Sequence, residues 1–135
     1  GGGQETRMAR YHPKSDGNVG RLDAVDLSTQ KTLWSVRQRA AMTSSALATA
    51  GGLVFAGDAD RWFRAYDDAT GNVLWQMRLN DAVNSYVISY AVKGKQYVAV
   101  VAGFGGPRIA NLHQLTTEIQ TPRGGAAALW VFEVP

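Results

Sequence analysis

A motif that recurs at a fixed spacing is the feature that most constrains how this chain of 135 residues can fold. Segment 24–37 shares six identities with segment 65–78, each at an offset of 41 residues. The shared types are Ala, Asp, Thr, Leu, Trp and Arg, at positions 24, 26, 29, 33, 34 and 37 of the first copy. A repeat of about 40–45 residues, rich in short runs in which apolar and polar residues alternate, indicates that each copy is one structural unit of several strands.

Short strand-like runs separated by turn residues fill both copies and continue beyond them. The predicted strands are 20–27, 33–37, 46–50, 53–57, 62–67, 73–79, 86–92, 95–102 and 128–134. Turn clusters such as Asp67-Asp68-Ala69-Thr70-Gly71 separate them, because Asp bonds its own backbone and Gly accepts positive φ. We therefore predict an all-β chain with about two blades and a closing strand of a β-propeller. Two unrelated hairpins in a sandwich are the alternative.

The predicted ring is incomplete in this chain. A blade cannot bury its two faces alone, and propellers typically need at least four blades to close. We expect residues 1–19 to form a loop that leads into the first strand. Residues 20–135 would be blades completed by another chain or a missing segment. A single strand at 128–134 fits a ring closed by pairing the two chain ends in one blade.

Composition excludes several classes of function. The net charge is only +3 and the basic residues are scattered, which argues against a nucleic-acid partner. The chain has no cysteine, so it has neither disulfides nor thiolate metal sites. No run of about 18 apolar residues is present, so we predict no membrane-spanning helix.

Three stretches carry a resemblance to a known family. They are the motif AxDxxTGxxxW, the phrase from Leu47 to Gln76, and the tail SYAVKGKQYVAVVAGFGG followed by GGAAALWVF. Together they resemble the C-terminal part of quinoprotein alcohol dehydrogenases, periplasmic enzymes that use pyrroloquinoline quinone (PQQ). The similarity runs from about residue 20 to the end of the chain.

The resemblance implies an eight-bladed propeller with the quinone in a funnel on the axis. In such motifs the Trp stacks on the neighbouring blade, near the glycine of its turn. Trp34 and Trp75 hold that place, and we expect both indoles to be buried structural residues. Gln30 stands where the second copy has the motif glycine, Gly71. We therefore expect a different turn shape at Gln30, which puts the docking of an indole against this turn in doubt.

The resemblance also implies hydride transfer from an alcohol or aldehyde to PQQ. A calcium or lanthanide ion polarises the quinone, and an Asp acts as base. A cytochrome c is the family's electron acceptor. We expect the base and the metal ligands to come from earlier blades, so this chain supplies no catalytic residue and no metal ligand. Asp58 and Asp60 form a close acidic pair, which a β-hairpin turn explains better than a calcium site.

Two stretches are predicted to touch the quinone. The first is Thr43-Ser44-Ser45, where relatives often place an aromatic residue; this chain has small hydroxyls there, so Thr43 offers a hydrogen bond at most. Ala128, Leu129 and Trp130 open the last strand, where the family brings backbone and an apolar side chain near the cofactor. Ordinary packing between blades is an equal alternative for Leu129 and Trp130. Phe104, in a glycine-rich loop, is predicted to line the substrate funnel.

Two other functions stay open at this point. One is a non-catalytic propeller scaffold for protein–protein interaction, of the kind found in outer-membrane assembly lipoproteins. Those scaffolds lack the long excursion from Gly103 to Gly125, which favours the enzyme. The other is an inactive truncated fragment.

Overall fold

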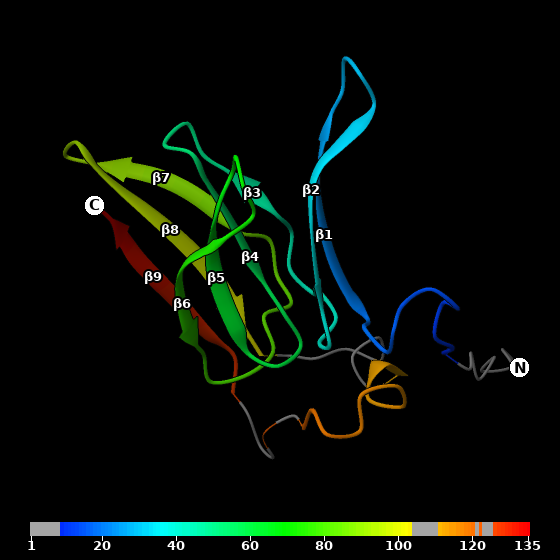
Figure 1. Ribbon diagram of the computed structural model, residues 1–135. Helices are drawn as coiled ribbons and strands as arrows, with labels where there is room; N and C mark the ends of the chain where they lie inside the picture. Colours follow the sequence, from blue (N-terminus) through cyan, green and yellow to red (C-terminus); the bar gives the residue numbers. More distant parts are fainter. Residues whose placement is uncertain (1–8, 104–110, 121, 123–125) are drawn as a thin grey trace, which may run out of the picture.

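The computed structural model describes residues 9–103, 111–120, 122 and 126–135. In this part of the chain, nine strands form three antiparallel sheets (Figure 1). The first sheet has β1 (Gly20–Asp26) and β2 (Lys31–Gln38); the second has β3 (Leu47–Ala48), β4 (Leu53–Gly57), β5 (Trp62–Asp67) and β6 (Val73–Arg78); the third has β7 (Ile88–Val92), β8 (Lys95–Ala102) and β9 (Ala128–Val134). The all-β prediction and the sector of a propeller are confirmed.

The strand boundaries agree with the sequence prediction at most ends. The inner strand predicted at 46–50 contracts to β3, and the strand predicted at 33–37 begins earlier, at Lys31. The excursion before β9 contains one helical turn, in which the amide of Thr116 donates to the carbonyl of Leu112 at 3.2 Å. Within the described residues, no helix is long and apolar enough to cross a membrane.

The sequence repeat is a structural repeat. Ala24 pairs with Trp34 in β1–β2, and Ala65 pairs with Trp75 in β5–β6. In both pairs the register shifts directly after the alanine. The first sheet therefore corresponds to the two outer strands of the second sheet.

The turn at Gln30 corrects one expectation. Gln30 has φ 57° and Gly71 has φ 76°, so both turns use the left-handed region at the same place. Asp26 accepts the amides of Ser28 and Thr29, just as Asp67 accepts those of Ala69 and Thr70. The predicted difference in turn shape is wrong, because the Asp side chain fixes the turn and Gln30 tolerates the strain.

The main apolar core lies between the second and third sheets. Phe55 and Phe63 of the second sheet are 4% and 0% exposed, and they belong to one buried cluster with Val98 and Val100 of β8. The ring of Phe132, from β9, lies 5.6 Å from that of Phe63. The second and third sheets bury their apolar side chains against each other, which is why these two sheets stack (Figure 1).

The Trp34 indole makes one of the contacts that connect the first sheet to the second. Trp34 Nε1 donates to the carbonyl oxygen of Asp68 at 2.7 Å. A Cβ placed on Gly71 would lie 2.7 Å from Trp34 Cε3, so the ring lies directly against the glycine. This contact needs both a missing side chain and positive φ at Gly71.

The second indole is not buried as expected. Trp75 is 39% exposed. It makes edge contacts with Phe63 and Phe132 at 6.2 and 5.1 Å between ring centroids. Within the part of the chain that the structure describes, the third sheet has three strands where the second has four, and no strand beyond β9 covers the indole.

The contact at Gly71 can be tested with a matched pair of variants. Gly94 has φ +78°, close to the +76° of Gly71, but an added Cβ would meet nothing within 4 Å. Gly94→Ala should lower the free energy of unfolding by about 1 kcal/mol through backbone strain. Gly71→Ala should cost about 2–4 kcal/mol, because overpacking against Trp34 is added. Urea unfolding of the complete propeller protein with each substitution compares them, and equal losses would contradict the Trp34 contact.

Candidate functional site

The segments that connect one sheet to the next, which we call links, lie at one end of the strands. Met42, in the link from β2 to β3, forms a bridge with Asp58 at the end of β4. Val83, in the link from β6 to β7, forms a bridge with Ala102 at the end of β8. These two bridges are equivalent, so β8 corresponds to β4 and β9 to β5. We call this end of the sheets the link end.

Thr43 lies at the link end and its hydroxyl is already engaged. Its Oγ1 donates to the carbonyl oxygen of Val83 at 2.6 Å, and its amide donates to the carbonyl of Gly57 at 3.1 Å. The side chain is half-buried. The hydroxyl proton is used within the protein, so a ligand could only donate to Thr43 and not accept from it.

Ala128 reaches the same end of the sheets through two backbone contacts. Ala128 pairs with Ala102 in the third sheet, and Ala102 forms the bridge with Val83. The carbonyl oxygen of Val83 accepts the hydrogen bond from the Thr43 hydroxyl. Thr43 and Ala128, which are far apart in the sequence, thus lie at the same end of the sheets. Their contact with a cofactor stays a prediction.

Leu129 and Trp130 point to opposite faces of the third sheet. Trp130 Nε1 donates to Asn80 Oδ1 at 2.7 Å, and the indole stacks on Phe132 at 6.2 Å with an interplanar angle of 6°. Leu129 is 69% exposed. These contacts favour the packing interpretation for Trp130, while a cofactor contact for either residue stays a prediction. Phe104, the predicted funnel residue, lies outside the described residues.

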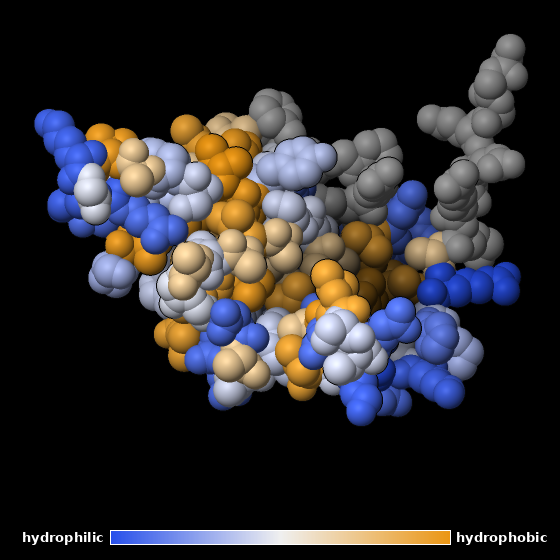
Figure 2. Space-filling model, turned by 90° about the horizontal axis from the view of Figure 1, so that it is seen from above, coloured by the Kyte–Doolittle hydropathy of each residue, from blue (hydrophilic) through white to orange (hydrophobic). Residues whose placement is uncertain are grey.

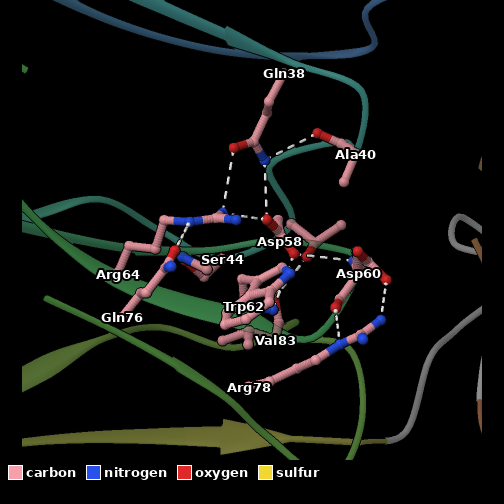
Figure 3. Close-up of polar contacts among 12 residues, drawn as sticks. Gln38, Ala40, Ser44, Asp58, Asp60, Trp62, Arg64, Gln76, Arg78 and Val83 are labelled. Atoms are coloured by element: carbon pink, nitrogen blue, oxygen red, sulfur yellow. Dashed lines mark hydrogen bonds and ion pairs between the residues drawn. The ribbon is translucent and has the colours of Figure 1, made fainter. Parts of the chain in front are cut away.

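A buried carboxylate is the centre of the polar contacts at the link end (Figure 3). Asp58 is 1% exposed. Its Oδ1 accepts the amides of Asp60 and Trp62 at 2.9 and 3.0 Å. Its Oδ2 accepts Gln38 Nε2 at 3.0 Å and Arg64 Nη1 at 2.5 Å. Four donors therefore compensate the burial of this charge.

The same contacts explain the acidic pair that the sequence singled out. Asp58 closes the turn between β4 and β5 by accepting two turn amides, as the hairpin interpretation predicted. Asp60 instead pairs with Arg78 through a 2.6 Å ion pair. Across the described ranges, no group of three or more His, Asp or Glu side chains could hold a metal ion.

Asp58 also joins two blades, which the sequence did not indicate. Gln38 belongs to β2 of the preceding sheet, and its amide bonds both Asp58 and the carbonyl of Ala40. Gln38 Oε1 accepts from Arg64 Nη1 at 3.2 Å (Figure 3). The alternation in Trp62-Phe63-Arg64 could have placed Arg64 on the face towards β2, but no sequence signal identifies Gln38 as its partner.

A polar pocket of 330 Å³ lies beside this cluster. The guanidinium carbons of Arg64 and Arg78 lie 5.4 and 5.6 Å from the ring centroid of Trp62. Arg39 and Glu118 form an ion pair on the wall of the pocket, and the hydrogen bond from Arg39 lowers the pKa of Glu118. Because its charges are paired, the pocket is electrically balanced.

Tyr66 lies buried on β5, in the same strand as Arg64. It is 0% exposed, and burial raises the pKa of its phenol, while the charge of Arg64 opposes that shift. The buried phenol of Tyr66 is therefore neutral at neutral pH.

Comparison with known proteins assigns the chain to a family. Antiparallel sheets that repeat in register and bury their side chains against one another define a β-propeller sector. The family model described as "PQQ: Glucose/ethanol/alcohol dehydrogenase, beta-propeller domain" matches residues 4–98. The chain belongs to this PQQ β-propeller family, and the resemblance found in the sequence is confirmed.

The chain is similar to quinoprotein alcohol dehydrogenases over most of its length. It is 33% identical over 120 residues to "Quinoprotein alcohol dehydrogenase PedE" of Pseudomonas putida, covering 89% of this chain and 19% of that protein. It is 34% identical over 116 residues to "Methanol dehydrogenase [cytochrome c] subunit 1" of Methylobacterium organophilum, covering 85% and 18%. The chain thus spans about a fifth of the length of these relatives.

Solved structures agree with the observed fold. A structure named "Europium-containing methanol dehydrogenase" superposes with a TM-score of 0.70 at 28% identity, over 84% of this chain and 23% of that one. The quinohemoprotein alcohol dehydrogenase of Comamonas testosteroni superposes with a TM-score of 0.60 at 41% identity, over 64% and 13%.

Two neighbouring carboxylates provide a test of the polar cluster. Asp58→Asn should lower the free energy of unfolding by about 3–5 kcal/mol, because it leaves Arg64 buried without its partner. Asp60→Asn is the control and should cost under about 1 kcal/mol, since its partner Arg78 is solvent-exposed. Urea unfolding of the complete propeller protein with each substitution measures the difference, and similar losses would show that the Asp58 contacts stabilise no more than the exposed pair does.

Proposed function

We propose that this chain is the C-terminal sector of a PQQ-dependent dehydrogenase that oxidises an alcohol or an aldehyde. One observation carries the proposal: the chain matches quinoprotein alcohol dehydrogenases over 89% of its own length but only 19% of theirs. In this proposal PQQ, when bound, accepts a hydride from the substrate. This sector shapes part of the funnel, and the base and the metal ion belong to other blades.

The groups at the link end fit a supporting role in binding the quinone. Thr43 offers hydroxyl lone pairs, and Ala128 offers backbone without a bulky side chain. Asp58 has its oxygens occupied by four donors, and the described residues contain no cluster of metal-binding side chains. Calcium or a lanthanide would therefore take its ligands from outside these residues.

Open sheet faces support the proposal that further blades complete the structure. On the outer face of the third sheet, Ile88, Val92, Leu129 and Val131 are 45–69% exposed. Figure 2 shows apolar side chains reaching the surface of the molecule seen from above. Among the described residues, no strand pairs with the outer edge of β9 as β6 pairs with β5, so a fourth strand can pair there. We propose that the remainder of the propeller covers this face and this edge.

The electron acceptor and the compartment follow from the same proposal. One relative carries cytochrome c in its name, so we propose a cytochrome c as the electron acceptor. The resemblance is to periplasmic enzymes, so we propose the periplasm as the location. The substrate would be a small alcohol or aldehyde.

The function is tested on the complete propeller protein that contains this sector. The apo-protein is loaded with PQQ and either calcium or a lanthanide, and alcohol-dependent reduction of an artificial electron-acceptor dye is followed. We expect a bound quinone spectrum and turnover that requires both PQQ and metal. A folded protein that binds no PQQ would overturn the proposal and favour the scaffold function.

The isolated chain gives a second test, of the incomplete ring. Expressed without the other blades, residues 1–135 should aggregate or remain molten, because apolar faces and strand edges lack partners. Analytical ultracentrifugation and thermal unfolding measure this. A monomer with one sharp, cooperative transition would contradict the proposed incompleteness.

A further inference from the structure

Two serines at the link end make the same pair of hydrogen bonds in successive blades. Ser44 Oγ accepts the amide of Gly57 at 2.7 Å and donates to the carbonyl of Ser45 at 2.7 Å. Ser85 Oγ accepts the amide of Val101 at 2.8 Å and donates to the carbonyl of Tyr86 at 3.1 Å. The serines are 41 residues apart, which is the spacing of the sequence repeat.

The hydroxyls of Ser44 and Ser85 accept strand amides that lie beyond the end of the neighbouring inner strand, where no backbone carbonyl of that strand pairs with them. The pairing of β3 with β4 ends at Leu47 and Phe55, so the amide of Gly57 lies beyond the inner strand. The pairing of β7 with β8 likewise ends at Ile88 and Ala99, before Val101. A buried amide without an acceptor is costly, and the serine hydroxyl supplies one where the link leaves the sheet.

Because the links leave the sheets at this point, the links of neighbouring blades can contact each other. The amide of Ser45 donates to the carbonyl of Ser85 at 3.2 Å, and Ser45 Oγ accepts the amide of Val87 at 2.8 Å. Thr43 Oγ1 donates to the carbonyl of Val83. The links of two blades are therefore fixed to each other by hydroxyl and backbone groups.

The packing at this point is too tight for the links to move independently. A Cβ on Gly57 would lie 2.4 Å from the Cβ of Val83, which is 0% exposed. Thr43 and Ser44 both donate their amides to the carbonyl of Gly57, at 3.1 and 3.2 Å. The position of Thr43 is thus set by the end of β4 and by the next link.

We propose that Ser44 and Ser85 are positioning residues of the funnel wall. Each hydroxyl fixes the link that enters an inner strand, and together they set the place of Thr43 relative to the start of β9. They act through the backbone and touch no ligand themselves. The role of the links in holding PQQ rests on the proposed function, whereas the hydrogen-bond role does not.

The hydrogen-bond role is tested by amide hydrogen exchange in the complete propeller protein. Ser44→Ala should accelerate exchange about tenfold in peptides covering the Gly57 amide and leave the Val101 amide unchanged. Ser85→Ala should do the reverse. Ser44→Thr keeps a hydroxyl and should restore protection. Ser28→Ala is the control, because that hydroxyl bonds Asp26 in an exposed turn. Unchanged exchange, or equal acceleration at both amides, would overturn the proposal.

The positioning role is tested by titrating the same apo-proteins with PQQ and following absorbance. Ser44→Ala should raise the Kd for PQQ about tenfold, while Ser44→Thr and Ser28→Ala stay near the starting value. Altered exchange with an unchanged Kd would reduce both serines to structural residues and overturn the positioning role. If the unsubstituted protein binds no PQQ, the proposed function fails while the exchange result still decides the hydrogen-bond role.

Discussion

Burial of aromatic side chains between consecutive sheets is the constraint on which the whole structure depends. No sheet here is thick enough to hold a core of its own, so Phe63 of one sheet packs against Phe132 of the next. The first sheet is connected by the Trp34 indole to Gly71. Stability is therefore a sum of neighbour interfaces, and each added sheet covers one apolar face while exposing another. The exposed Leu129 face is the direct consequence.

Polar contacts take over where the strands end. At the link end, β4 and β8 extend past their inner neighbours, and their last amides must find acceptors outside the sheet. Ser44 and Ser85 provide those acceptors, and Asp58 accepts two amides of the turn between β4 and β5. Hydrogen bonds are directional and apolar contacts are not, so this end of the sheets can hold link segments in one defined position. The end that carries the candidate residues thus joins neighbouring blades through polar contacts.

The candidate site was only partly visible in the sequence. The role of Asp58 in a turn followed from its local pattern, since its partners Asp60 and Trp62 lie within four residues. Its bond to Gln38 crosses between blades and has no local signature. Thr43 and Ala128 were selected separately by resemblance, and only the folded chain brings them to one end of the sheets. The sequence placed Ser44 and Ser85 in the links, but the amides that their hydroxyls accept lie 13 and 16 residues away and are identified only in the folded chain.

The sequence by itself determined the strands, the turns and the repeat, because alternation and Asp-turn chemistry act over a few residues. It also determined the family, through motifs that extend along most of the chain. Only the tertiary structure decided that Trp75 stays partly exposed and that Trp130 packs against Asn80. Those outcomes depend on which sheet faces lie opposite one another, and that is set by the stacking of sheets rather than by any neighbouring residue.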